Sequence, residues 1–195
     1  VCSSDLFLLI GNWFTLVRLE MKKLLLTLSL ALCSITASAV ELVEVKALNG
    51  KVSINAPKDF GPMPDDILEF KYPSTRRPTE VLSDETGGVT LVFNHTNNSM
   101  APSDVKNAHV AISKIFHNMY PSATWIRDEV IVQNNQTFMV LELITPAIDT
   151  EIHNIMYGTS VDGRFLLTAF NTTVEQSEQW LPIGKKIMAS LSISE

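Results

Sequence analysis

The sequence predicts an α+β sandwich built around an antiparallel sheet, and three observations support this. Runs of alternating apolar and polar residues are joined by short turns, of which Asn49-Gly50 and Asp162-Gly163 are typical of hairpins. Two other segments carry apolar residues at helical spacing, one mid-chain and one near the end. Strands joined by tight turns pair antiparallel, so the two amphipathic helices are left to cover the sheet.

Most elements of the first half are strands delimited by turn residues. Alternating apolar positions on both sides of Asn49-Gly50 predict a two-residue hairpin turn, and Pro64 followed by two acids predicts a short helix. Prolines then bound a loop, because a residue before proline avoids the helical region. In order, we expect strands at 43–47 and 52–56, a helix at 65–70, a loop at 72–78, strands at 79–83 and 89–95, and a connector at 97–102.

The second half is predicted as a helix, a meander and a last helix. Ser103 is expected to cap a helix that ends before Pro121, and Thr173 with Gln176 is expected to form a capping box. Pro182 lies inside the last helix, which therefore either kinks or restarts there. Strands are expected at 124–133, 137–145, 151–161 and 164–171, and the apolar stripes comprise Val105, Ala108, Ile112, Ile115, Phe116 and Met119 in the first helix and Trp180, Ile183, Ile187 and Leu191 in the second.

The beginning of the chain is typical of a targeting segment. A positive start is followed by an apolar run and then by small residues: Met21, Lys22, Lys23, residues 24–32 and Ala37-Ser38-Ala39. This order is typical of a secretory signal peptide cleaved near Ala39 and Val40. The apolar run is shorter than the roughly 20 residues of a membrane span. We therefore expect a periplasmic protein with no transmembrane anchor in its mature chain.

Two further interpretations concern the same region. Acylation of Cys33 would make a lipoprotein, which we favour less because the residue before such a cysteine is normally small and here it is Leu32. Val1 to Leu6 back-translates to GTG TGC TCT TCC GAT CT, which resembles a short-read sequencing adapter. We interpret residues 1–20 as non-native read-through, residues 21–39 as the signal peptide and residues 40–195 as one domain.

Composition excludes several classes of protein. The whole chain has a net charge of -6, and this acidic balance argues against nucleic-acid binding. Both cysteines fall before Val40, so the mature chain has neither a disulfide framework nor a thiol nucleophile. The stability of the domain must then come from its apolar core.

Side chains with catalytic or ligand chemistry are sparse. No serine lies in a Gly-X-Ser-X-Gly elbow, and His109 and His117 are too far apart along one helix, about 12 Å, to share an ion. Glu151 and His153 fall on the same face of a strand, the only local pair with ligand character, and we expect them on a solvated face. We therefore expect no metal, no cofactor and no catalytic residue, and hence no enzyme.

The order of elements, together with Lys71–Pro78, Val89–Phe93 and Ile187–Leu191, resembles the Mog1/PsbP-like superfamily, and within it the periplasmic DcrB type. The resemblance covers nearly all of residues 50–194. It implies an α-β-α sandwich with a central antiparallel sheet. Members are accessory, docking or assembly proteins of diverse function, so the resemblance implies a role in binding without naming a partner.

Arg76 and Arg77 are the candidate partner-binding residues. Two adjacent guanidinium groups in a proline-bounded loop of an acidic protein could hold an anion or a partner's carboxylate. The alternative is that one arginine ties the loop to acidic neighbours such as the Asp65–Glu69 segment.

Two functions stay open at this point. The first is a non-enzymatic periplasmic accessory protein that binds another envelope protein. The second is a carrier of a small apolar ligand in a pocket between sheet and helix, with aromatic residues that more often belong to a core: Trp125, Phe138, Tyr157, Phe165 and Trp180.

Overall fold

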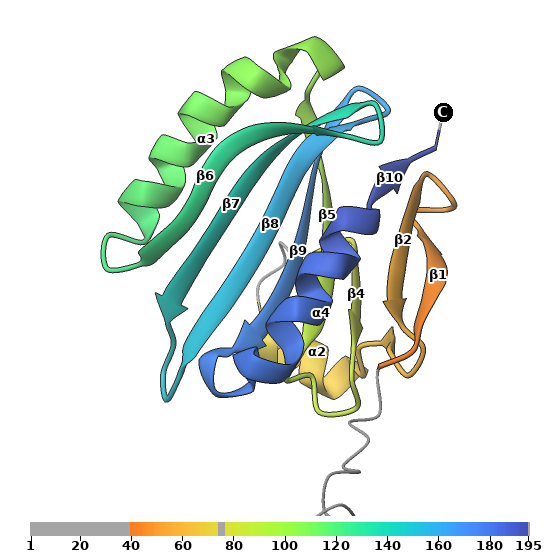
Figure 1. Cartoon of the computed structure of the whole chain (residues 1–195), viewed down its shortest axis with the longest axis vertical. Coiled ribbons are helices and arrows are strands. Elements are labelled where there is room, and N and C mark those ends of the chain that lie inside the picture. The colour runs from red at the N-terminus through yellow and green to blue at the C-terminus, as the bar shows by residue number, and fades with distance from the viewer. Residues whose placement is uncertain (1–39, 74–76, 195) are drawn as a thin grey trace, which may run out of the picture. The chain divides into compact units, whose positions relative to one another are not determined.

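The computed structural model describes residues 40–73 and 77–194, so the predictions for residues 1–39 lie outside this part of the chain. The strands form two antiparallel sheets, one ordered β3-β4-β5-β9-β8-β7-β6 and one ordered β1-β2-β10 (Figure 1). The strands are β1 (Leu42–Ala47), β2 (Val52–Pro57), β3 (Gly61–Pro62), β4 (Glu80–Ser83), β5 (Thr90–Ser99), β6 (Thr124–Gln133), β7 (Gln136–Pro146), β8 (Glu151–Val161), β9 (Arg164–Thr173) and β10 (Ser192–Ile193). The helices are α2 (Asp65–Lys71), α3 (Val105–Met119) and α4 (Ser177–Ser190), and the 3-10 turns are η1 (Pro102–Asp104) and η2 (Val174–Gln176).

The meander from β6 to β9 forms the larger part of the seven-stranded sheet. Asn134 and Asn135 join β6 to β7 with φ of 50° and 61°, and Asp162 and Gly163 join β8 to β9 with φ of 50° and 68°. Two successive residues in the left-handed region are what a two-residue hairpin turn of type I′ requires, and Asn, Asp and Gly tolerate that region best. The predicted Asp162-Gly163 turn and the strands predicted on either side of both turns are therefore confirmed.

Both faces of the seven-stranded sheet are covered. Alternate residues of its central strands point to opposite sides, so that Phe138 and Val140 join one buried cluster while Leu141 and Leu143 join another. The first cluster is closed by α4 and the small sheet, through residues such as Ile187 and Ile54. The second is closed by α3 and α2, which lie on the other face (Figure 1). This arrangement confirms the predicted α-β-α sandwich.

The helix α4 joins the two sheets. Ile187 and Met188 are fully buried between the seven-stranded sheet and β2. The hydroxyl of Ser190 accepts a hydrogen bond from the backbone N–H of Asn55 in β2 at 2.8 Å. Pro182 lies inside α4 without ending it, so of the two predicted alternatives the restart is wrong.

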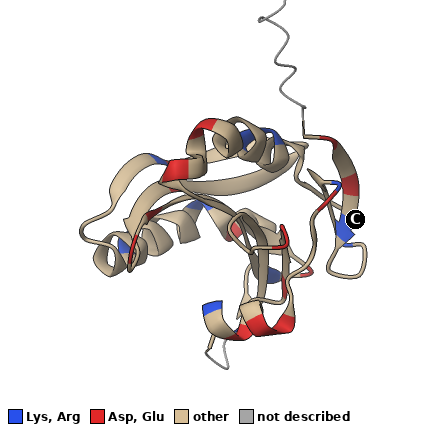
Figure 2. Cartoon of the chain, turned by 90° about the horizontal axis from the view of Figure 1, so that it is seen from below, with Lys and Arg blue, Asp and Glu red and all other residues tan. Residues whose placement is uncertain are grey.

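The helix α2 begins after Pro64, as predicted. Its first turn carries Asp65 and Asp66 and its last turn carries Lys71 (Figure 2). The three charges are favourable for the helix dipole, which is positive at the N-terminus and negative at the C-terminus.

The first predicted hairpin is confirmed, because β1 and β2 pair antiparallel and Asn49 and Gly50 take positive φ of 57° and 85°. Its loop is wider than two residues, since Leu48 also takes a positive φ of 52° and the last strand pair is Ala47 with Val52. The predicted connector at 97–102 is partly strand, since β5 continues to Ser99.

The predicted helix caps are also absent. The hydroxyl of Ser103 contacts the Asp104 side chain, and α3 begins after the 3-10 turn η1 without a side-chain cap. The side chain of Thr173 contacts the side chain of Gln176, so the capping box is not formed.

The predicted apolar stripe of α3 is only partly covered, because Ile115 and Met119 are exposed. Within the described residues, no helix is long and apolar enough to cross a membrane.

We predict that Gly184→Ala lowers the free energy of unfolding by about 1–3 kcal/mol. A β-carbon at residue 184 would lie 2.3 Å from two ring carbons of Phe170, which is fully buried. This overpacking outweighs the roughly 1 kcal/mol that alanine gains over glycine in a helix. Denaturant unfolding measures the change. Gly61→Ala is the matched control, because a β-carbon there meets no atom within 4 Å. Equal stability of both variants would contradict this packing.

Candidate functional site

The predicted arginine pair is only partly within the described residues, because Arg76 lies outside them. The side chain of Arg77 donates from Nε to the backbone carbonyl of Tyr72 at 3.0 Å. Tyr72 is the residue that caps the C-terminus of α2, where free carbonyls are left without a helical partner. Arg77 thus contacts the end of α2 through a carbonyl group while remaining exposed.

A buried acid–base pair lies on the face of the sheet beneath α4. His153 of β8 donates from Nε2 to Oε1 of Glu142 in β7 at 2.9 Å, and both side chains are almost completely buried. The other carboxylate oxygen, Oε2, has no hydrogen-bond partner among the described residues. Lys185 of α4 places its Nζ 3.6 Å from Oε1. The expectation that His153 lies with Glu151 on a solvated face is therefore wrong.

The charges around Glu142 keep its carboxylate ionised. Burial raises the pKa of Glu142, but the hydrogen bond from His153 and the positive charges of Lys185, His153 and Arg127 together lower it below its ordinary value. The carboxylate accepts and cannot donate, so Nε2 of His153 carries the proton in this contact. The arrangement balances a buried charge and leaves no group exposed to a substrate.

A second polar cluster joins α3 to β6. Asp128 accepts hydrogen bonds from Nε2 of His109 at 2.7 Å, from the hydroxyl of Ser113 at 2.6 Å and from Nε2 of His117 at 3.0 Å. The ring of His117 also stacks on Trp125, with centroids 3.7 Å apart. The two histidines, two helical turns apart, thus share one carboxylate that lies between them.

Asp128 acts here as a clamp between helix and strand. Burial raises the pKa of Asp128, but the hydrogen bonds from Ser113, His117 and His109 outweigh that effect and leave it below its ordinary value. Ser113 donates to the carboxylate and not to an imidazole, so it is not arranged as an activated nucleophile. Among the described residues, no group of three or more His, Cys, Asp or Glu side chains could hold a metal ion.

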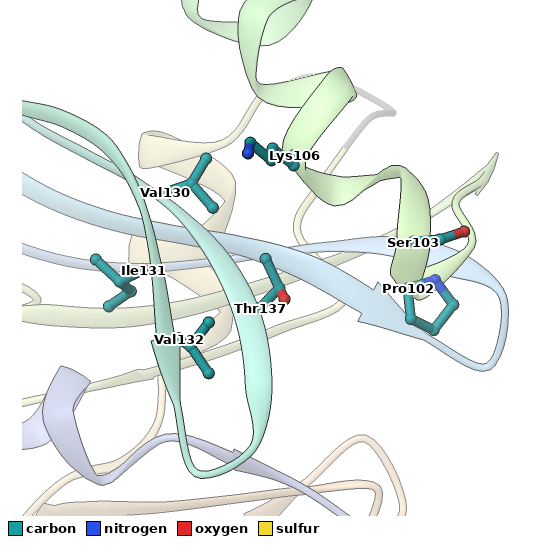
Figure 3. Close-up of a pocket in the computed structure, with 7 residues that line it drawn as sticks. All are labelled: Pro102, Ser103, Lys106, Val130, Ile131, Val132 and Thr137. Atoms are coloured by element: carbon teal, nitrogen blue, oxygen red, sulfur yellow. The ribbon is translucent and has the colours of Figure 1, made fainter.

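An apolar groove of about 440 Å³ lies beside the end of β6, between that strand and the beginning of α3 (Figure 3). One wall is formed by the η1–α3 segment and the other by the β6–β7 hairpin: Pro102, Ser103 and Lys106, and Val130, Ile131, Val132 and Thr137. Val130 and Val132 point toward the helix side, whereas Ile131 points away (Figure 3). The side chain of Val132 is 75% exposed. This groove is a candidate binding surface.

Sequence reasoning missed these residues, although Glu142 and the Val130 to Val132 run each left a signal. Glu142 is the only charged residue in the apolar run 137–145, and such an isolated charge indicates burial with a partner. The apolar run Val130 to Val132 breaks the alternation of its strand and indicates that both faces are apolar there. Pairing of Asp128 with α3 had no local signal. The proposed pocket aromatics Phe138 and Tyr157 are instead buried in the core.

We predict that His153→Leu lowers the free energy of unfolding by about 3–5 kcal/mol, since it leaves the buried carboxylate of Glu142 without its closest partner. Glu142→Leu should cost less, because it removes the buried carboxylate together with its unpartnered Oε2. The double variant should then be more stable than His153→Leu alone. Denaturant unfolding of all three variants measures this coupling. Strictly additive losses would contradict the buried pair.

We predict that the stability difference between the protein and its Asp128→Asn variant depends on pH. Because the folded-state pKa of Asp128 is lowered, its contribution is present above the unfolded-state pKa and is lost as the pH falls through the folded-state pKa. The difference in unfolding free energy should therefore be largest near neutral pH and shrink below about pH 4. Urea titrations across this range measure it. A difference that stays constant with pH would contradict the clamp.

Comparison with known proteins gives a match at the level of structure. No family model and no curated protein matches the chain. The solution structure of cyanobacterial PsbP (CyanoP) from Synechocystis sp. PCC 6803 aligns with a TM-score of 0.57 and 12% identity, over 82% of this chain and 96% of that one. The Saccharomyces cerevisiae Ran-binding protein Mog1p aligns with a TM-score of 0.49 and 9% identity, over 80% and 96% of the two chains. LpqN of Mycobacterium tuberculosis, involved in cell envelope biogenesis, aligns with a TM-score of 0.48 and 10% identity, over 80% and 91%.

At this level of identity the likeness to cyanobacterial PsbP concerns the fold and carries no site residue across. It agrees with the layers found here, a seven-stranded sheet with helices on both faces. The chain therefore has the Mog1/PsbP-like fold that its sequence predicted.

Proposed function

We propose that this protein is a non-enzymatic, exported accessory protein that acts by binding another envelope protein. The observation that carries the proposal is the apolar groove beside β6, where Val132 remains 75% exposed. Exposed apolar side chains next to a concave surface are typical of interaction sites. The signal-peptide pattern of residues 21–39 supports export to the envelope.

The polar clusters support a structural use of the chemically reactive side chains. Glu142 and His153 are buried beneath α4, and Asp128 is occupied by three donors from α3. Such groups hold elements together, whereas a catalytic group needs access to a substrate. The accessible chemistry of the groove is apolar, with Lys106 as its charged lining residue.

A carrier of a small apolar ligand is the second candidate function. It is favoured by the position of the groove between the sheet and α3, and by its volume of about 440 Å³. Pockets that hold small molecules have volumes of about 300–1,000 Å³. A stoichiometric apolar molecule that co-purifies with the protein would favour this function over the first.

We also propose that the arginine pair Arg76 and Arg77 is a second contact surface, which binds an anionic partner. Of its two residues, Arg77 is exposed at the end of α2. A guanidinium group that donates one hydrogen bond to a carbonyl keeps four further N–H groups for a carboxylate. The loop therefore supports binding of an acidic surface patch.

We predict that in-cell cross-linking of the tagged full chain captures one stoichiometric envelope protein, and that Val132→Lys reduces this capture at least about tenfold. The charge would enter an apolar contact without a partner. Arg77→Ala should reduce the capture less and make the remaining complex less sensitive to salt. Quantitative mass spectrometry and melting curves measure capture and folding. If the unchanged protein and its variants all fold and none of them captures a stoichiometric partner, the proposed function is contradicted.

A further inference from the structure

The outer edge of β6 is a row of backbone groups with which no strand of the described residues pairs. β6 is the last strand of the seven-stranded sheet and pairs with β7 on its other side. In an antiparallel pair, alternate residues direct both N–H and C=O away from the neighbour. Within the described part of the chain, no strand pairs with these outward groups. The edge therefore has free hydrogen-bonding capacity along its length of 10 residues.

The two halves of this edge differ in their protection. The first half contains a register shift between Trp125 and Arg127, followed by Arg127, Asp128 and Glu129. Bulges and charges of this kind keep natural edge strands from pairing with other chains. The second half, Val130–Gln133, has no charge, proline or register shift. The opposite end of the sheet is protected in another way, because β3 is only 2 residues long.

The unprotected half of β6 lies next to the groove. Val130 and Val132 form part of its lining, with Pro102 and Lys106 on the other wall (Figure 3). A strand added to the edge would lie about 4.8 Å from β6 and would send every second side chain to the groove side. Since the lining is apolar apart from Lys106, Ser103 and Thr137, the side chains that fit are apolar, with one acid opposite Lys106.

We propose that Val130–Gln133 is a strand-addition site for an extended peptide segment of a partner protein. The segment has apolar side chains at alternate positions and a carboxylate that reaches Lys106. This inference rests on the proposed function and names its surface and its mode of recognition. In this mode the backbone hydrogen bonds supply affinity and the groove supplies specificity.

Two other occupants fit less well. A small apolar molecule could fill the groove but would leave the outward N–H and C=O groups of β6 without partners. A second copy of the chain, paired antiparallel about Ile131, would set Val130 against its own Val132 and offer valine side chains to the groove. A second copy in this register would place its own Val132, and not a carboxylate, opposite Val130. An extended acidic and apolar peptide meets both the backbone and the charge.

In the test, peptides that bind the immobilised full chain are selected from a displayed random-peptide library. The affinity of the enriched peptides is then measured by isothermal titration calorimetry. We expect peptides with alternating apolar residues and an acid, and Val132→Lys should weaken them by about tenfold or more. Ile148→Lys is the matched control, because Ile148 is fully exposed in the loop after β7 and receives the same charge. Lys106→Glu should select peptides with a basic residue in place of the acid.

Backbone pairing is tested separately. The best peptide is made in two forms, each N-methylated at one of the two alternating sets of residues. One form should lose binding and the other should retain it, because only one set donates to β6. Hydrogen exchange should slow at β6 amides when the peptide binds. Equal binding by both methylated forms, peptides unaffected by Val132→Lys, or no enriched peptide would each overturn the proposal.

The cross-linking experiment separates this inference from the proposed function. If Val132→Lys still captures the stoichiometric envelope partner, the protein binds a partner elsewhere and the strand-addition site is wrong. If the peptides bind as expected and cross-linking finds no protein partner, the edge is a competent peptide site but the proposed function fails.

Discussion

The fold depends on one constraint, which is that the central strands of the seven-stranded sheet are apolar on both faces. Residues of β7 from Phe138 to Leu141 are almost completely buried in succession, and their side chains alternate between two clusters. A sheet of this kind needs a cover on each side, because exposing either face would cost about 25 cal/mol for every Å² of apolar surface. The short helix α2 and the long helix α3 therefore share one face, while α4 and the small sheet share the other.

The helix α4 packs closely against the seven-stranded sheet. Gly184 faces the ring of Phe170, and the space there admits no β-carbon. On the same face, Glu142 and His153 occupy buried positions that apolar residues would fill at less cost. Lys185 from α4 approaches the carboxylate, so a charged contact as well as an apolar one fixes the position of the helix.

The sequence was sufficient where the controlling interactions are local. Asn134-Asn135 and Asp162-Gly163 set their turns through their own backbone preferences, so β6 and β8 were predicted with their observed bounds. It was insufficient where the controlling partner is distant. Asn97 to Ser99 have the composition of a turn, yet β5 extends through them because Ser99 pairs with Arg164 across a register shift.

The candidate site shows the same division. His153 was assigned to solvent because its partner Glu142 lies on a neighbouring strand, and the register that joins them is set by the whole meander. Asp128 likewise meets His109 and His117 only through the packing of α3 on β6. The predicted arginine loop could be named from its residues, but the groove beside Val132 needed the position of η1.

The different constraints on the two halves of β6 follow from how far α3 extends over the sheet. Asp128 binds three side chains of α3, and the ring of His117 covers Trp125, so the first half of the strand is tied to the helix. Near the beginning of α3 the chain turns away through η1, and the strand loses that cover at Val130 and Val132. In the strand-addition proposal, the half of β6 that is tied to α3 holds Val130–Gln133 in an extended conformation, which would lower the entropy cost of adding a strand there.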